Sequence, residues 1–288
     1  MQAIIINNEI KKSSSSEIVP WWSFGKTVLA AAIFKLVEAE RLDLDSCYLG
    51  LKASLRQVLR HESGLKDYYT EKAYHDAVNN NEPVWPFEEM LRKMNADKLL
   101  FEPAQGWMYS NIGYAYIRML IEKETNQSLE EALQSLVFDV IEIYDVKVAL
   151  STKDLKNCVN IDKNYHPGWL YHGLLIGELR HAAKFLDALA NNKIISNNSL
   201  NQMRESHSLD FEIKDRPWKN PAYAYGLMTD YREDKLSSFG HTGVGPNSTI
   251  AVYHFFNGSN KVTVAVSSNT IKQAVSEYKV LSIAKEYI

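Results

Sequence analysis

A serine and a lysine stand close together at the start of an apolar segment near the N-terminus. Ser23 and Lys26 are three residues apart, directly before the apolar run 27–39. In a helix this spacing places both side chains on one face. Ser23 would lie at the positive end of the helix dipole, where its unpaired backbone N–H can stabilise an oxyanion. A lysine held inside beside that hydroxyl could take its proton, or support a phenolate that does so.

The same pair has a plain structural interpretation. Ser23 could cap the helix while Lys26 extends its ammonium group to solvent. The S-x-x-K pattern is also short, and a chain of this length should contain about one or two matches by chance. Ser276 and Lys279 form a second match, which we interpret as a coincidence.

A second group of candidate residues is Y-S-N, with Tyr109 and Asn111 at its ends. It follows an aromatic-rich stretch bent by Pro103 and Gly106, which suits side chains presented to a cleft. A tyrosine near a lysine can have its pKa lowered and act as a general base, and the Asn111 amide can bind a substrate carbonyl. Alternatively, Ser110 or Asn111 is the N-cap of the helix that follows.

A third group is the glycine-rich stretch 240–247, GHTGVGPN. Its glycines would let a ligand approach the backbone of a strand end closely. Thr242 can donate a hydrogen bond, and His241 can donate one or carry a charge. A histidine is only partly charged near neutral pH, so it would attract a substrate carboxylate less firmly than an ammonium group. The alternative is an edge strand that enters a turn and contains a structural histidine.

In this order, S-x-x-K, Y-x-N and H-T-G resemble the signature of penicillin-recognising serine enzymes. The central tyrosine is similar to that of the branch holding class C β-lactamases, D,D-peptidases and family VIII esterases, and the resemblance covers nearly the whole chain. Most β-lactamases carry lysine where this chain has His241. The resemblance implies that Ser23 is the acylated nucleophile, that Lys26 and Tyr109 share the proton transfer, and that Asn111, His241, Thr242, Gly243 and Val244 bind substrate, with the backbone N–H groups of Ser23 and Val244 as the oxyanion hole.

Within this family the residues leave several activities open. A β-lactam, a D-amino-acid peptide and a carboxylic ester all fit an acyl-enzyme hydrolase. A catalytically silent protein that binds cell-wall peptides or partners is the alternative from another class.

The order of the predicted elements indicates the fold class. Strand-like runs lie near both chain ends, and helical runs lie between them, with a change of character near Pro217. We therefore expect a single α+β domain of the β-lactamase/transpeptidase type, with an antiparallel sheet formed by 1–26 and 217–288 and a mainly helical insert, 27–216. The predicted elements are a short strand with a turn at 7–8, a loop at 13–16, helices at 27–39, 54–64, 87–95, 112–126, 128–141, 176–192 and 272–288, and strands at 237–243, 247–256 and 261–270 with a hairpin turn at 257–260.

Composition sets broad limits on partners and cofactors. The chain has 288 residues, 45% hydrophobic and 23% charged, with a formal net charge of -3, so nucleic acid exerts no general electrostatic attraction. No apolar run reaches the roughly 20 residues of a membrane span. Metal and nucleotide motifs are missing, and His166 and His172 have no acidic partner at ligand spacing, so we expect no cofactor and a small-molecule or peptide substrate.

The sequence leaves three questions open. Cys47 and Cys158 could form a disulfide, remain free thiols or simply fill the core. The first residues do not have the form of a signal peptide. The protein would be cytoplasmic if the chain is complete, and periplasmic or secreted if a signal was removed before residue 1. The oligomeric state is likewise open.

Overall fold

The structure is a computed structural model that describes residues 1–13, 16–209, 214–233 and 235–288, so Ser14 and Ser15 of the expected loop lie outside the described residues. Within these ranges, eight strands form one antiparallel sheet in the order β2-β1-β11-β10-β9-β8-β7-β6. Their bounds are β1 Gln2–Ile6, β2 Glu9–Ser13, β6 His207–Ser208, β7 Pro221–Tyr223, β8 Met228–Arg232, β9 Lys235–Gly245, β10 Ser248–Asn257 and β11 Asn260–Ser268.

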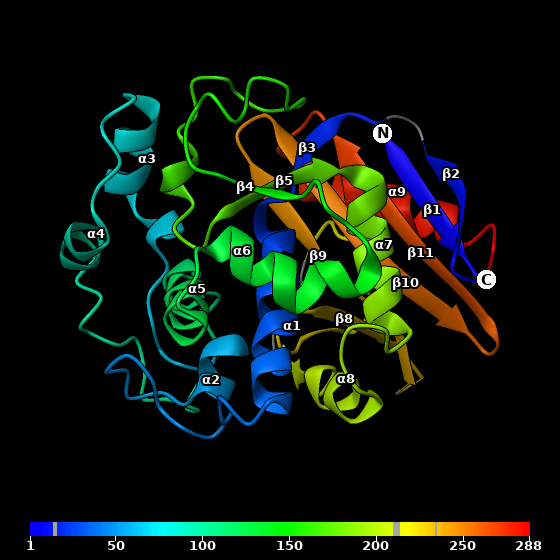
Figure 1. The fold of residues 1–288 in the computed structure, drawn as a ribbon, viewed down its shortest axis with the longest axis horizontal. Helices are drawn as coiled ribbons and strands as arrows, with labels where there is room; N and C mark the ends of the chain where they lie inside the picture. Colours follow the sequence, from blue (N-terminus) through cyan, green and yellow to red (C-terminus); the bar gives the residue numbers. More distant parts are fainter. Residues whose placement is uncertain (14–15, 210–213, 234) are drawn as a thin grey trace.

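The two ends of the chain meet in this sheet, as the sequence predicted. Strand β1 pairs with β11, from Gln2 opposite Val266 to Ile6 opposite Val262, and both termini lie at the same end of the molecule (Figure 1). The turn at Asn7 and Asn8 has positive φ at both residues, which asparagine tolerates, and it leads into β2, a strand that the sequence analysis did not predict. The hairpin at 257–260 joins β10 to β11 as expected.

Two helices cover opposite faces of the sheet. Alternate residues of β10 point to opposite sides, so Ile250 and Val252 join the large core that contains α7 (Leu179–Ala190), while Ala251 and Tyr253 pack with α9 (Gln273–Ala284). Figure 1 shows α7 and α9 on either side of β10 and β11. Strand β6 belongs to this sheet and helix α7 packs on it, although both precede Pro217. The boundary between a sheet subdomain and a helical subdomain near Pro217 stays a prediction.

Helix α1 (Gly25–Glu38) is the centre of the helical part. It is buried nearly all round, as its apolar sequence predicted, and it packs against α5 (Asn111–Thr125). A small second sheet, β3-β5-β4, lies beside it. The remaining elements are β3 Ile18–Pro20, β4 Lys147–Ala149, β5 Leu174–Glu178, α2 Leu55–Leu59, α3 Lys72–Asn79, α4 Phe87–Lys93, α6 Leu129–Leu133, α8 Asn197–Met203 and the short turns Trp22–Phe24, Tyr68–Thr70, Gln134–Phe138, Asp139–Ile141 and Pro167–Trp169.

Four predicted helices differ in their limits, and the last of them, expected over 272–288, spans only Gln273–Ala284. Helix α2 ends at Leu59, and Gly64, with φ +76°, lies in the loop beyond it rather than at the helix end. The helix expected over 128–141 ends at Leu133 and continues as π and 3₁₀ turns. Residues 176–178 belong to β5, so α7 begins only at Leu179. Apolar periodicity alone does not separate a buried strand from the first turn of a buried helix.

The described residues answer the open question about the two cysteines. Cys47 is exposed and Cys158 is buried, and both thiols are free. No helix in the described ranges is long and apolar enough to cross a membrane.

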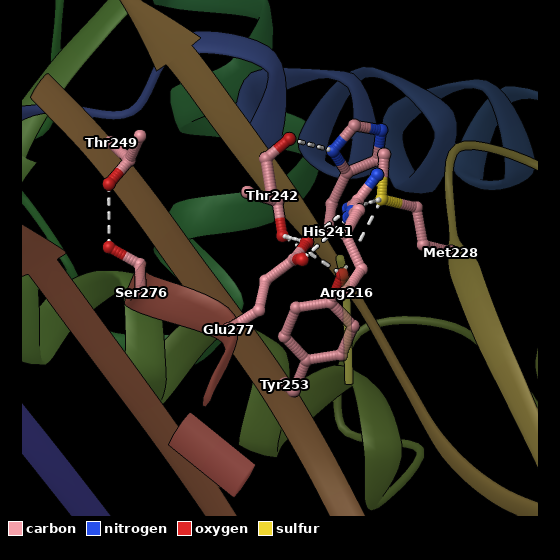
Figure 2. Close-up of polar contacts among 8 residues, drawn as sticks. All are labelled: Arg216, Met228, His241, Thr242, Thr249, Tyr253, Ser276 and Glu277. Atoms are coloured by element: carbon pink, nitrogen blue, oxygen red, sulfur yellow. Dashed lines mark hydrogen bonds and ion pairs between the residues drawn. The ribbon is translucent and has the colours of Figure 1, made fainter. Parts of the chain in front are cut away.

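The second S-x-x-K match has a structural role that predicts a measurable cost. Ser276 is fully buried on α9, where its hydroxyl contacts Thr249 Oγ1 at 2.6 Å (Figure 2) and donates to Ser268 Oγ at 2.9 Å, while Lys279 is exposed. We expect Ser276→Ala to lower the free energy of unfolding by about 1 kcal/mol, because the hydroxyl groups of Thr249 and Ser268 would each lose their hydrogen bond with Ser276. Urea unfolding measures this loss, and an unchanged midpoint would contradict it.

Candidate active site

A cavity of about 930 Å³ opens between the main sheet and the helical part, and most of the predicted site residues meet at its wall. Lys26, His241 and Gly243 do not line it but lie directly behind the lining. Lys26 and His241 are fully buried there. The predicted residues that line the cavity are Ser23, Tyr109, Asn111, Thr242 and Val244.

Ser23 is presented by a tight turn rather than by a helix. It lies in the 3₁₀ turn Trp22–Phe24 between β3 and α1, and its side chain is half-buried. Trp22 has φ 42°, a strained value for a bulky residue, and its Nε1 donates to Ser248 Oγ at 2.9 Å, which holds the turn. Helix α1 begins at Gly25 with Phe24 as its N-cap. The interpretation of Ser23 as a helix cap is therefore wrong.

Lys26 points inward, so the alternative in which it reaches solvent is also wrong. Its side chain is 0% exposed. Nζ donates to Asn111 Oδ1 at 2.6 Å and to Ser23 Oγ at 3.3 Å, and His172 Nε2 lies 3.5 Å away. Burial lowers the pKa of the Lys26 amine to about 7, and the negative charge of Asp67 opposes this shift. The amine is thus neutral in a large fraction of molecules near pH 7, as a general base requires.

Asp67, which the sequence analysis missed, fixes the amide that holds Lys26. Asn111 donates from Nδ2 to both carboxylate oxygens of Asp67, at 2.9 and 3.2 Å, and its backbone N–H also donates to Asp67. Because Nδ2 is engaged in this way, Oδ1 turns toward Lys26. Burial raises the pKa of Asp67, against these hydrogen bonds and the nearby Lys26. The sequence contains one sign of this residue. Asp67 is an acidic residue shortly after 61–65 (HESGL), in a stretch that the sequence otherwise predicts to be buried.

Tyr109 lies on the cavity wall beside Ser23, but it keeps its proton. Burial raises the pKa of the phenol well above its ordinary value, and a hydrogen bond with Ser23 opposes this only in part. Lys26 Nζ lies 5.0 Å from the centre of the ring. The expectation that a neighbouring lysine lowers the pKa of Tyr109 is therefore wrong, because desolvation of the phenolate outweighs it.

The residues after Tyr109 serve both interpretations of this segment. Ser110 is the N-cap of α5, where its Oγ accepts from the Gly113 N–H at 3.0 Å. Asn111 is the first residue of α5 and points into the site instead. One short sequence thus begins a helix and supplies a site residue.

His241 is neutral, in contrast to the expectation of a partly charged histidine. Its Nδ1 donates to the Thr242 carbonyl at 2.8 Å, so Nε2 accepts from the Tyr223 hydroxyl at 3.1 Å. Burial, with a contribution from Lys26, lowers its pKa to about 3. The proposed role of His241 in substrate binding cannot rest on an imidazolium charge near pH 7.

Gly243 lets strand β9 lie directly against the turn that holds Ser23. A Cβ atom at this position would lie 2.8 Å from the Ser23 nitrogen and 2.7 Å from Trp22 Cβ. Gly245 leaves room for the Trp22 ring in the same way. Gly243 and Gly245 are therefore required by packing against the turn that holds Ser23, and they bring the backbone of β9 beside the Ser23 N–H.

A separate group of side chains has metal-ligand types. Among the described residues, the ligand atoms of Asp145, Glu178 and His181 lie within 4.8 Å of one another. Arg180 Nε lies 2.7 Å from Glu178 Oε2, so this carboxylate already has a cationic partner. The group does not line the cavity.

The antiparallel sheet between α7 and α9, with the helical part beside it, is the β-lactamase/transpeptidase-like arrangement that the sequence predicted. The Beta-lactamase family model matches residues 6–281, so the chain belongs to the β-lactamase family.

Comparisons with individual proteins agree with this assignment. The chain is 33% identical over 89 residues to "Penicillin-binding protein 4*" of Bacillus subtilis (strain 168), a match to 30% of this chain and 19% of that protein. A D-stereospecific amidohydrolase from Streptomyces sp. superposes with a TM-score of 0.78 at 19% identity, over 98% of this chain and 92% of the other. A D-amino acid amidase from Ochrobactrum anthropi SV3, complexed with D-phenylalanine, gives 0.77 at 21% identity, over 98% and 96%. At these identities the structural likeness shows the fold.

The packing of Gly243 predicts a loss of activity on a small substitution. If Ser23 is the reactive residue that the sequence predicts, Gly243→Ala should lower kcat/KM on the order of 10²-fold, because the added methyl group displaces the turn that holds the Ser23 side chain. Gly258→Ala is the control: its φ of +62° makes alanine strained there and should lower stability, but Gly258 lies at a hairpin tip that does not line the cavity, so kcat/KM should stay unchanged. Ester hydrolysis measured with both variants tests this, and equal activities would contradict it.

Proposed function

We propose that the protein is a serine hydrolase that cleaves amide or ester substrates through an acyl-enzyme on Ser23. The observation that carries this proposal is the contact of the fully buried Lys26 amine with Ser23 Oγ at 3.3 Å, together with a pKa near 7. An amine in this state can accept the hydroxyl proton at neutral pH, which an ordinary exposed lysine cannot do.

The protonation states suggest how the residues divide the reaction. Ser23 Oγ attacks the substrate carbonyl carbon while its proton passes to Lys26 Nζ. The oxyanion forms beside the backbone N–H groups of Ser23 and Val244, which Gly243 allows to lie close together. Tyr109 donates its proton to the leaving nitrogen or oxygen as that bond breaks, and the proton on Lys26 replaces it.

Deacylation repeats these steps with water. Water attacks the acyl carbonyl and gives its proton to Lys26, and Ser23 leaves as the hydroxyl. The base is therefore the amine, and the phenol acts as an acid, because burial favours the neutral form of each.

The cavity wall favours an apolar acyl group. The cavity is large enough for a small acylated amino acid or dipeptide, and its lining is rich in aromatic side chains. Two structural neighbours are named as a D-stereospecific amidohydrolase and a D-amino acid amidase, which makes D-amino-acid amides and peptides suitable first substrates beside β-lactams and esters. The aromatic lining residues are Trp22, Tyr69, Tyr74, Trp107, Tyr109, Tyr165, Trp218, Tyr223 and Tyr253.

The first test is covalent labelling of Ser23. Intact mass after incubation with a fluorophosphonate should show one adduct, and Ser23→Ala should lose it and lower ester hydrolysis by about 10⁴-fold or more. The fold should remain, since Ser23 does not cap a helix; a loss of about 1 kcal/mol is expected from its hydrogen bonds. Residual turnover in Ser23→Ala equal to wild type would overturn the assignment, and a wild type that takes no label would favour the silent binding protein.

The second test is the pH profile of kcat/KM. The Lys26 amine must be neutral to act, so activity should rise with pH through about 7 and level off above it. His241 stays neutral throughout this range, because its pKa is about 3. Profiles for nitrocefin, which carries a carboxylate, and for a neutral p-nitrophenyl ester should therefore run parallel. A profile that falls from pH 6 to 8 for nitrocefin alone would contradict the neutral state of His241.

A further inference from the structure

A buried carboxylate lies behind the cavity wall at strand β9. Thr242 pairs with Ala251 and so faces α9, whereas His241 pairs with Val252 and faces the opposite side. Figure 2 shows Thr242 pointing toward Glu277 of α9, with His241 directed away from it. The Glu277 side chain is 0% exposed. An acidic side chain at such a depth needs partners of its own.

The partners of Glu277 are the groups that would otherwise bind a carboxylate from the cavity. Arg216 Nε donates to Oε2 at 2.6 Å, and Arg216 Nη2 donates to Oε1. The Thr242 hydroxyl donates to Oε1 at 2.6 Å. Both Arg216 and Thr242 line the cavity, whereas Glu277 does not. Glu277 therefore engages two cavity-lining donors from behind.

These contacts reduce the attraction of the two groups for a second anion, although Arg216 keeps further N–H donors. A threonine hydroxyl has one proton, which here points to Glu277, so its oxygen can offer only lone pairs elsewhere. Tyr253 lies 3.0 Å from that oxygen. The guanidinium and carboxylate charges of Arg216 and Glu277 cancel, so the pair presents no net positive charge. Lys214 also borders the cavity, but it is exposed and therefore screened by solvent.

From this arrangement we infer that Glu277 occupies the carboxylate-binding groups of the site as an internal carboxylate. The enzyme then acts on substrates whose carboxyl end is neutral, as in an amide or ester, in preference to substrates with a free carboxylate there. This inference rests on the proposed function, since it names the substrate class of the same site. It also fits the neutral state of His241, which removes the other cation that the motif could have offered.

A matched pair of substrates tests the inference directly. N-benzoylglycine thioesters of mercaptoacetate and of methyl mercaptoacetate share the acyl group and differ at the far end of the leaving thiol, which is a carboxylate in the first and its neutral methyl ester in the second. Release of the thiol itself is read with a chromogenic disulfide. Wild type should favour the neutral thioester by about tenfold or more in kcat/KM. If it cleaves the charged thioester as well as or better than the neutral one, the inference is overturned, and this result needs no variant.

The variant Glu277→Gln then tests the cause. It keeps the shape of the side chain and removes its charge, so Arg216 gains an uncompensated positive charge. The ratio of charged to neutral thioester turnover should rise by about tenfold, and an unchanged or lower ratio in a folded variant would overturn the inference. Glu286→Gln, an exposed residue near the end of the same chain, is the matched control and should leave the ratio as it is. Circular dichroism and the melting temperature establish that each variant is folded; if Glu277→Gln is unfolded, the wild-type ratio alone decides.

Failure of this inference is distinct from failure of the proposed function. Turnover of both thioesters that depends on Ser23, but with the charged one favoured, rejects the role of Glu277 and leaves the serine hydrolase intact. Absence of Ser23-dependent turnover for either thioester, together with absence of labelling by the fluorophosphonate, rejects both.

Discussion

The burial of the Lys26 amine away from water is the constraint on which the arrangement of the other site residues depends. Lys26 is completely covered by protein, and an ammonium group in that position loses its hydration. Asn111 Oδ1, at 2.6 Å, and the charge of Asp67 behind it return part of that stabilisation. Helices α1 and α5 must therefore pack closely, and the loop that carries Asp67 must lie against the start of α5. A large part of the helical core thus serves to hold one amine at a pKa near 7.

The same burial decides the protonation of the neighbouring groups. Desolvation disfavours a charge whatever its sign, so it lowers the pKa of Lys26 and His241 and raises that of Tyr109. Of these three groups, only the amine changes its ionisation near neutral pH. One physical effect thus gives these three groups different protonation behaviour, as the proposed roles of Lys26 as base and Tyr109 as acid require.

The sequence predicted what depends on short separations and on the general order of elements. Ser23 and Lys26 are three residues apart, and the 257–260 turn joins strands directly, so local rules were sufficient. The two-ended antiparallel sheet followed from strands at both chain ends. The expectations of a lowered pKa for Tyr109 and of a partly charged His241 were wrong, because spacing does not show how much protein covers a group. Asp67 and Glu277 were missed because their partners lie 44 and 61 residues away. An acidic residue on the buried face of the last helix, next to Ser276, was the available sign of Glu277.

Strand alternation accounts for the histidine in the third motif. His241 and Thr242 are neighbours in sequence, yet the strand directs them to opposite faces, one toward Lys26 and the other toward Glu277. On the inner face, the charge of Lys26 already disfavours a second cation, and it contributes to the low pKa of His241. Histidine occupies that place as a neutral ring. It is hydrogen-bonded to the Tyr223 hydroxyl and to the Thr242 carbonyl. On the face of β9 that Thr242 shares with Glu277, the cation is Arg216, and the carboxylate of Glu277 neutralises its charge. With a neutral ring at 241, Lys26 is the group of this pair whose ionisation changes near neutral pH.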